Sequence, residues 1–174
     1  MGKNYKADLH KITTLIFDYD GVFTDGKILL TPDGDTLRTG NVKDGYSIQL
    51  AVKNDYNVVV ISGGYSISTQ KRLESLGVKH IYLGVKDKQK VYETFLKEHN
   101  ISDEQVIYMG DDIPDYFCMQ KAGIACCPYD AVEEIKEICD YISYQKGGMG
   151  CVRDIVEQVL KVQGNWMNHT AHSW

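Results

Sequence analysis

Short runs of apolar, often β-branched residues recur along this chain and alternate with segments of helical spacing. The clearest runs lie at residues 13–17, 58–61, 80–83 and 106–109, with weaker ones at 124–126 and 141–142. Apolar runs of this length without polar alternation are typical of strands that are buried on both faces. The alternation of such strands with helices predicts an α/β fold, a Rossmann-like parallel sheet with helices on both faces.

The segments between the runs carry the expected helices, at 46–53, 66–76, 88–98, 131–138 and 152–162, with another that begins near Pro114. One segment breaks the pattern, because a turn at 31–35 separates two short stretches at 27–30 and 36–39. This spacing predicts a β-hairpin after the first strand. The hairpin and the first helix fill the chain up to the second strand, which leaves no room for a cap domain there. We expect one domain over 1–164 and a tail over 165–174 that lacks periodicity.

Composition excludes several classes of protein. The 174 residues include 19 Lys and Arg against 24 Asp and Glu, a net charge of −5, which argues against nucleic-acid binding. No stretch approaches the roughly 18 apolar residues of a membrane span, and the polar first residues do not resemble a secretory signal. The five cysteines show no C-x-x-C spacing and are expected to be buried hydrophobes in a reducing compartment. We therefore expect a cytoplasmic protein.

Acidic residues follow the predicted strands at the points where each strand ends. Asp18 and Asp20 follow the first run, Asp111 and Asp112 follow the fourth, and Asp115 comes shortly after. Ligands of open parallel sheets bind beyond the carboxyl ends of the strands, so these side chains are expected to converge. Converging carboxylates repel one another unless a cation lies among them, and an all-oxygen set suits Mg²⁺.

A calcium-binding loop is the first alternative for the Asp18-x-Asp20 pair. That loop needs Asp or Asn at its fifth position and Gly at its sixth, where this chain has Val22 and Phe23. The calcium loop is therefore excluded.

Groups that can hold an anion follow the other strands. Ser62 ends the second run and precedes Gly63 and Gly64, whose backbone N–H groups can approach an anion closely, and Lys88 opens a helix after the third run. A hydroxyl, a lysine and a divalent cation supply donors and positive charge for three phosphoryl oxygens. The sequence thus predicts a phosphoryl-transfer site.

The order and placement of these residues resemble the motifs of the haloacid dehalogenase superfamily. The matching motifs are Asp18-Tyr19-Asp20-Gly21-Val22, Ser62, Lys88 and Gly110-Asp111-Asp112-x-x-Asp115. The resemblance implies that Asp18 is the nucleophile, which becomes an aspartyl-phosphate, and that Asp20 is the general acid–base. It also implies that Asp18, the backbone carbonyl of Asp20 and Asp111 bind Mg²⁺ with support from Asp115, and that Ser62 and Lys88 hold the phosphoryl group.

Within the superfamily the chain is most similar to the 3-deoxy-D-manno-octulosonate 8-phosphate (KDO 8-phosphate) phosphatases. The similarity lies in residues 20–26, 41–45, 62–63, 147–153 and 162–165. It implies a Mg²⁺-dependent homotetramer of lipopolysaccharide precursor synthesis that acts on a phosphorylated sugar acid, with a tail that can reach a neighbour's site. The substrate contacts that it implies come from Asn41, Lys43, Asp44, Gly45, Gly63 and Arg72. One departure is Gly64, which stands where many such enzymes carry an Arg that could bind the substrate carboxylate.

Two alternatives remain open from the sequence. A phosphatase of nine-carbon, sialic-type acid 9-phosphates shares the fold without a cap and the hairpin. The Gln163-Gly164-Asn165 ending and the turn at Ser62 favour the eight-carbon substrate. A non-enzymatic phospho-acceptor module, like a receiver domain, places its paired acids on the first strand and its acceptor on a later one, the reverse of the order here.

Because a small-metabolite phosphatase without a cap still needs a lid, we expect neighbouring subunits to provide it through the hairpin.

Overall fold

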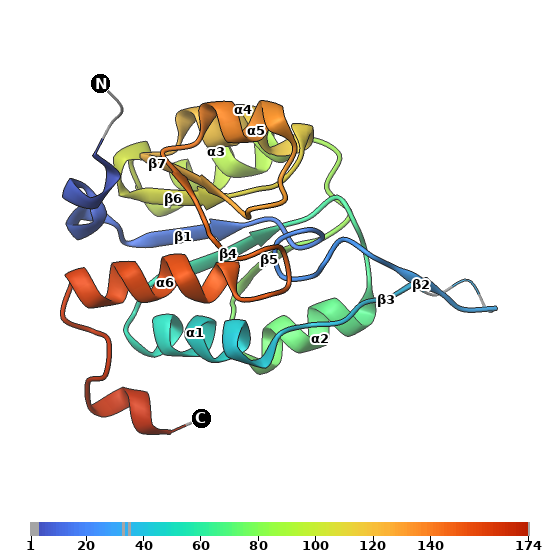
Figure 1. Ribbon diagram of the computed structural model, residues 1–174, viewed down its shortest axis with the longest axis horizontal. Helices are drawn as coiled ribbons and strands as arrows, with labels where there is room; N and C mark the ends of the chain where they lie inside the picture. The colour runs from blue at the N-terminus through green and yellow to red at the C-terminus, as the bar shows by residue number, and fades with distance from the viewer. Residues whose placement is uncertain (1–3, 33, 35, 174) are drawn as a thin grey trace.

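The computed structural model describes residues 4–32, 34 and 36–173, and its centre is a six-stranded parallel sheet (Figure 1). The strand order is β5-β4-β1-β6-β7-β8. The bounds are β1 Thr14–Phe17, β4 Asn57–Ile61, β5 His80–Tyr82, β6 Val106–Met109, β7 Ile124–Cys127 and β8 Tyr141–Ile142. The predicted α/β class is confirmed, and the part of the chain that the structure describes forms no separate cap domain.

Among the residues that the structure describes, six α-helices cover the sheet in two layers. Figure 1 shows α1, α2 and α6 on one face and α3, α4 and α5 on the other. Their bounds are α1 Val42–Lys53, α2 Ile67–Ser75, α3 Lys88–His99, α4 Tyr116–Lys121, α5 Glu133–Ile138 and α6 Cys151–Val162. Within the described residues, none of them is long and apolar enough to cross a membrane.

The central strands are apolar on both faces because each face has its own core. In β1, Leu15 and Phe17 belong to the cluster under α1 and α6, whereas Ile16 belongs to the cluster under α3 and α4. Val58 and Val59 of β4 divide in the same way. This two-sided burial explains why the strands read as continuous apolar runs.

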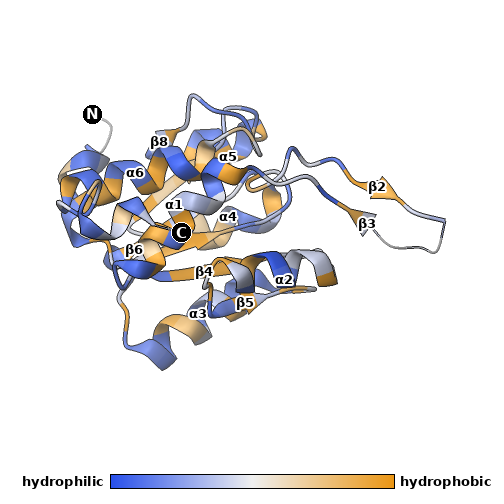
Figure 2. Ribbon diagram, turned by 90° about the horizontal axis from the view of Figure 1, so that it is seen from below, coloured by the Kyte–Doolittle hydropathy of each residue, from blue (hydrophilic) through white to orange (hydrophobic). Residues whose placement is uncertain are grey.

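The predicted hairpin is present and extends away from the body of the molecule (Figure 2). Its strands β2 Leu29–Leu30 and β3 Thr36–Leu37 pair antiparallel, while Asp33 and Asp35 of the predicted turn lie outside the described residues. Leu29 and Leu30 are 66% and 70% exposed. The hairpin therefore carries apolar side chains that its own chain does not cover.

The first helix begins four residues earlier than expected. The Asn41 side chain accepts a hydrogen bond from the Lys43 backbone N–H (2.8 Å) and caps α1 at Val42. An Asn before a helix is one of the preferred N-caps, so the signal was present in the sequence. The helix consequently includes Asp44 and Gly45, which precede the predicted helix at 46–53.

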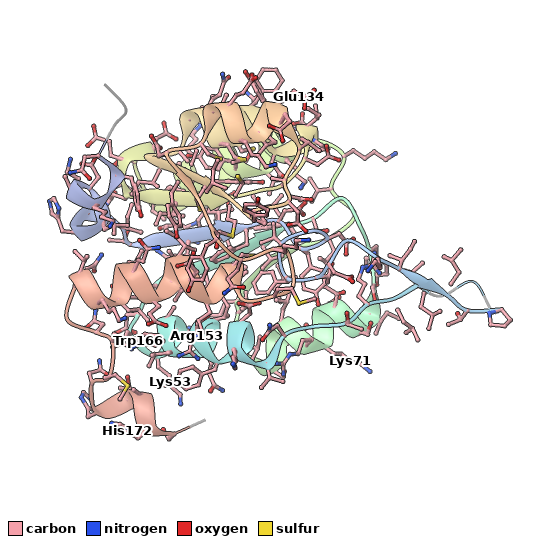
Figure 3. All side chains as sticks on the ribbon, in the orientation of Figure 1. Lys53, Lys71, Glu134, Arg153, Trp166 and His172 are labelled. Atoms are coloured by element: carbon pink, nitrogen blue, oxygen red, sulfur yellow. The ribbon has the colours of Figure 1, made fainter. Side chains whose placement is uncertain are left out.

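The C-terminal segment packs against α1 and α6 of its own chain. The Trp166 ring contacts Tyr46 edge-on, with 6.4 Å between centroids, and the Arg153 guanidinium lies 5.1 Å from the Trp166 centroid (Figure 3). A 3₁₀ turn at His169–His172 follows, and the Tyr46 hydroxyl donates to the Ala171 carbonyl (2.5 Å). The sequence, which shows no periodicity here, did not predict this docking.

Candidate active site

The site forms at the carboxyl ends of β4, β1 and β6, three adjacent strands at the centre of the sheet. Asp18 follows β1, Ser62 follows β4 and Asp111 follows β6, and the Asp18 backbone N–H still bonds the Met109 carbonyl (3.0 Å). Parallel pairing in register brings these three strand ends together. The convergence that the sequence predicted is thus present for Asp18, Asp111 and Asp115, whereas Asp112 is exposed.

A buried lysine joins two of the carboxylates. Lys88 Nζ lies 2.9 Å from Asp18 Oδ2 and 2.8 Å from Asp115 Oδ1, and its side chain is only 5% exposed. The Tyr108 hydroxyl also donates to Asp115 Oδ1 (2.8 Å), and the Tyr19 backbone N–H donates to Asp18 Oδ1 (2.6 Å). Although burial alone would lower it, Asp115 and Asp18 raise the pKa of Lys88, so this amine stays charged.

Three carboxylates form a group that fits a divalent cation. One oxygen from each of Asp18, Asp111 and Asp115 lies within 4.8 Å of the others. Asp111 Oδ1 and Asp115 Oδ2 are buried and have no hydrogen-bond partner among the described residues. A buried carboxylate oxygen without a donor is costly, and a hard cation among the three would satisfy both atoms.

Burial and mutual repulsion raise the pKa of two of these acids. The pKa of Asp18 rises to about 7, first because burial removes its water and then because Asp115 repels its charge, against partial relief from Lys88. Burial, with repulsion from Asp18 and Asp115, raises the pKa of Asp111 to about 8. A bound divalent cation reverses this balance, because it favours the charged form of each ligand.

Asp20 does not join the carboxylate group but pairs with a residue of the hairpin. Arg38, which directly follows β3, donates from Nε to Asp20 Oδ1 (2.6 Å) and from Nη2 to Asp20 Oδ2 (2.9 Å). Arg38 was not predicted as a site residue, because a single cation on a hairpin does not indicate which acid it contacts.

Asp18, Asp20, Lys88 and Asp111 line a cavity of about 810 Å³. Ser62 lies on its wall, and its Oγ accepts a hydrogen bond from the Gly64 backbone N–H (3.2 Å). Phe117 and Pro114 add an apolar patch, and Phe117 is mostly exposed. The full lining is Asp18, Asp20, Gly21, Gly26, Ser62, Gly63, Gly64, Val85, Lys86, Asp87, Lys88, Gln89, Asp111, Asp112, Pro114 and Phe117.

The predicted substrate-binding residues divide among different places. Gly63 lines the main cavity, whereas Asn41, Gly45 and Arg72 surround a separate cavity of about 20 Å³, and Lys43 is exposed beside α6. Of these residues only Gly63 lines the main cavity, and substrate contact remains a prediction for all of them.

The Asp44 side chain links two helices of this chain, α1 and α6. Its side chain is fully buried, and Oδ1 accepts from the Arg153 backbone N–H (2.8 Å) in the first turn of α6. Burial raises its pKa to about 6, against the opposing hydrogen bonds from the Arg153 and Gly150 backbone. Asp44 therefore ties α1 to the start of α6, while the substrate contact that the resemblance implied for it stays a prediction.

A loop from the far end of the chain supports the loop that carries Asp18 and Asp20. The Gly148 backbone N–H donates to the Val22 carbonyl (2.9 Å), and Cys151 Sγ lies 3.2 Å from the same oxygen. A Cβ at Gly147 would lie 2.0 Å from the Gly21 carbonyl oxygen, so only glycine allows this approach.

The fold and the site together define a class, the α/β proteins that hold acidic, hydroxyl and lysine side chains at the carboxyl edge of a parallel sheet. A haloacid dehalogenase-like hydrolase model matches residues 74–150. The KDO 8-phosphate phosphatase of Escherichia coli (strain K12) is 35% identical over 158 residues, which cover 91% of this chain and 84% of that protein. The chain belongs to the haloacid dehalogenase-like hydrolases.

Solved structures of relatives have the same fold. The KDO 8-phosphate phosphatase of Yersinia pestis superposes with a TM-score of 0.89 at 33% identity, covering 92% of this chain and 86% of that one. The enzyme of Moraxella catarrhalis, crystallised in complex with magnesium ion, phosphate ion and KDO, gives 0.89 at 29% identity and covers 92% of both chains. The expected superfamily and the expected similarity within it are both confirmed.

Proposed function

We propose that the chain is a Mg²⁺-dependent phosphatase that hydrolyses KDO 8-phosphate to KDO and phosphate, in lipopolysaccharide precursor synthesis. The observation that carries this proposal is the grouping of the Asp18, Asp111 and Asp115 carboxylates with the buried Lys88 amine, at a cavity that Asp18, Lys88 and Asp111 line. Relatives named for this activity align over most of both chains and supply the identity of the substrate.

The residues that would hold Mg²⁺ are Asp18 and Asp111, with the backbone carbonyl of Asp20 and with Asp115 beside them. A bound Mg²⁺ supplies positive charge that keeps the carboxylates ionised and offsets the charge of the transferring phosphoryl group. The two unpartnered oxygens of Asp111 and Asp115 support this assignment.

The chain's own groups provide the two displacement steps. An Asp18 carboxylate oxygen attacks phosphorus, the ester P–O bond breaks, and Asp20 gives a proton to the departing sugar oxygen. Asp20 then takes a proton from the water that attacks the aspartyl-phosphate, which releases inorganic phosphate and restores Asp18. Lys88 and Ser62 hold the phosphoryl oxygens during both steps.

Substrate choice and assembly complete the proposal. A nine-carbon, sialic-type acid 9-phosphate is the alternative substrate, since it would fit the same site chemistry. The exposed Leu29 and Leu30 of the hairpin support a homotetramer in which neighbouring subunits close the site. We place the enzyme in the cytoplasm, where its sugar-phosphate substrate occurs.

Phosphate release from the eight-carbon and nine-carbon esters, with Mg²⁺ and with EDTA, tests the proposal. We expect multiple turnovers that need Mg²⁺ and a higher kcat/KM for the eight-carbon ester. Asp18→Asn should abolish turnover and leave the fold intact, because it removes the nucleophile. A higher kcat/KM for the nine-carbon ester would reverse the choice of substrate, and a single turnover would instead support the phospho-acceptor module.

A further inference from the structure

The hairpin holds Asp20 through both of its carboxylate oxygens. The Arg38 guanidinium donates from Nε to Asp20 Oδ1 (2.6 Å) and from Nη2 to Asp20 Oδ2 (2.9 Å), and the Arg38 side chain is only 9% exposed. Two parallel N–H···O bonds fix both the position and the plane of a carboxylate, which a single ammonium contact does not. The orientation of Asp20 is therefore set by a residue 18 positions away in sequence.

Arg38 is itself held from the opposite side. Its Nη1 donates to the backbone carbonyl (3.1 Å) and to the hydroxyl (2.9 Å) of Thr36 in β3. Arg38 is absent from the lining of the main cavity, whereas Asp20 is part of it. The guanidinium thus lies behind Asp20 as seen from the cavity.

The missing side chain at Gly64 makes room for this pair. A Cβ there would lie 2.8 Å from Asp20 Oδ2 and 3.0 Å from Arg38 Nη2. Real Cβ contacts are rarely so short, so a larger residue at 64 would displace one of the two groups. Gly64, Asp20 and Arg38 consequently form one packed unit between the β4 loop and the hairpin.

We propose that Arg38 is a positioning residue, which acts through Asp20 to aim its carboxyl at the leaving oxygen of the substrate. The inference rests on the proposed role of Asp20 as general acid–base. It assigns the hairpin a function within the site of its own chain, namely to orient the group that transfers the proton. Arg38 then matters most for esters whose leaving oxygen needs a proton, and least for esters whose leaving group departs as a stable anion.

A series of aryl phosphates, from 4-methoxyphenyl to 2,4-dinitrophenyl phosphate, measures this dependence without requiring the sugar substrate. For Arg38→Ala we expect kcat to fall by about 10-fold or more on 4-methoxyphenyl phosphate and by less than about 3-fold on 2,4-dinitrophenyl phosphate, with little change in KM. Arg38→Lys should recover part of the lost activity, because lysine keeps the positive charge but cannot donate two parallel hydrogen bonds to the carboxylate. Lys27→Ala removes an exposed hairpin cation that contacts Asp25, and serves as the matched control.

A double-mutant cycle separates positioning from a merely structural effect. If Arg38 acts through Asp20, Arg38→Ala should cause little further loss in an Asp20→Asn background. Equal losses on all aryl phosphates, or additive losses in the cycle, would overturn the inference. Thermal melts identify any variant that unfolds, and Arg38→Lys then provides the test. Failure to hydrolyse KDO 8-phosphate would refute the proposed function alone, because the aryl series still reports on Arg38.

Discussion

Asn in place of Asp111 is expected to stabilise the metal-free protein and to remove its stabilisation by Mg²⁺. Asp111 Oδ1 is buried without a hydrogen-bond partner among the described residues, and the carboxylate faces Asp18 and Asp115. An amide of nearly the same shape removes the repelling charge but keeps the packing. The same change removes an anionic ligand from the proposed cation site.

The magnitude follows from the pKa of Asp111, which burial and its acidic neighbours raise from 3.8 to about 8. At about 1.4 kcal/mol per pH unit, ionising this group at pH 8 costs at most about 5 kcal/mol of folding free energy. Residual solvent and the shared repulsion reduce this, and we expect a gain of about 2 kcal/mol for Asp111→Asn. In a domain of this size that corresponds to an increase in Tm of about 4–8 °C.

The sign of the pH dependence follows from the same shift. A carboxyl whose pKa is higher in the folded than in the unfolded state binds its proton more tightly in the folded protein, so folding stability falls as pH rises from about 4 to about 8. The gain from Asp111→Asn should therefore be largest near pH 8 and should shrink toward pH 5. Mg²⁺ should raise the Tm of the unmodified protein more at pH 8 than at pH 6, since protons compete with the cation.

Differential scanning calorimetry in EDTA and at saturating Mg²⁺ measures both effects. The unmodified protein should gain about 2–3 kcal/mol at a Mg²⁺ concentration of about 100 times the dissociation constant. Asp112→Asn is the matched control, because Asp112 is exposed and an Asn there can still cap the following 3₁₀ turn. A lower Tm for Asp111→Asn in EDTA at pH 8, or an undiminished response to Mg²⁺, would refute the reasoning.

Three further predictions concern the buried cation, the hairpin and the tail. Lys88→Met should abolish phosphate release and cost about 3 kcal/mol in urea unfolding at pH 7.5, because it leaves two buried carboxylates without their counter-charge; unchanged stability would contradict this. Leu30→Glu should reduce the mass measured by light scattering and lower kcat/KM, whereas an unchanged mass would exclude the hairpin as the interface. A chain that ends at Gly164 should lose about 2 kcal/mol, or about 4–8 °C in Tm, since it lacks the Trp166 contacts; an equal Tm would show that they contribute nothing.

The strands, and the edge of the sheet at which the site lies, could be predicted because both depend on local sequence. A strand buried on two faces must be apolar throughout, as β1 and β6 are, and the carboxyl ends of parallel strands necessarily meet. The positions of Asp18 and Asp111 follow directly from this geometry. The role of Ser62 as an anion-holding group depends on the same edge and remains a prediction.

Side-chain contacts between residues that are far apart in the sequence could not be predicted in this way. The Arg38 pair with Asp20 depends on how the hairpin returns to the sheet, and Lys88 in a run of lysines resembles a solvated face until α3 buries it against Asp115. Asp44 shows the same limit, because its hydrogen bond from the Arg153 backbone depends on where α6 begins. The docking of Trp166 depends on aromatic packing between residues that are 120 positions apart, which periodicity cannot reveal.

The contact of Gly147 and Gly148 with the loop at Gly21 and Val22 has a consequence for how the enzyme matures. During synthesis the two aspartates of the first strand leave the ribosome long before the segment that braces them. Until that segment is added, the chain lacks the backbone contacts that hold the loop after Asp18. Substitutions that impair activity at raised temperature should therefore include residues of the loop before α6, far in sequence from the reacting groups.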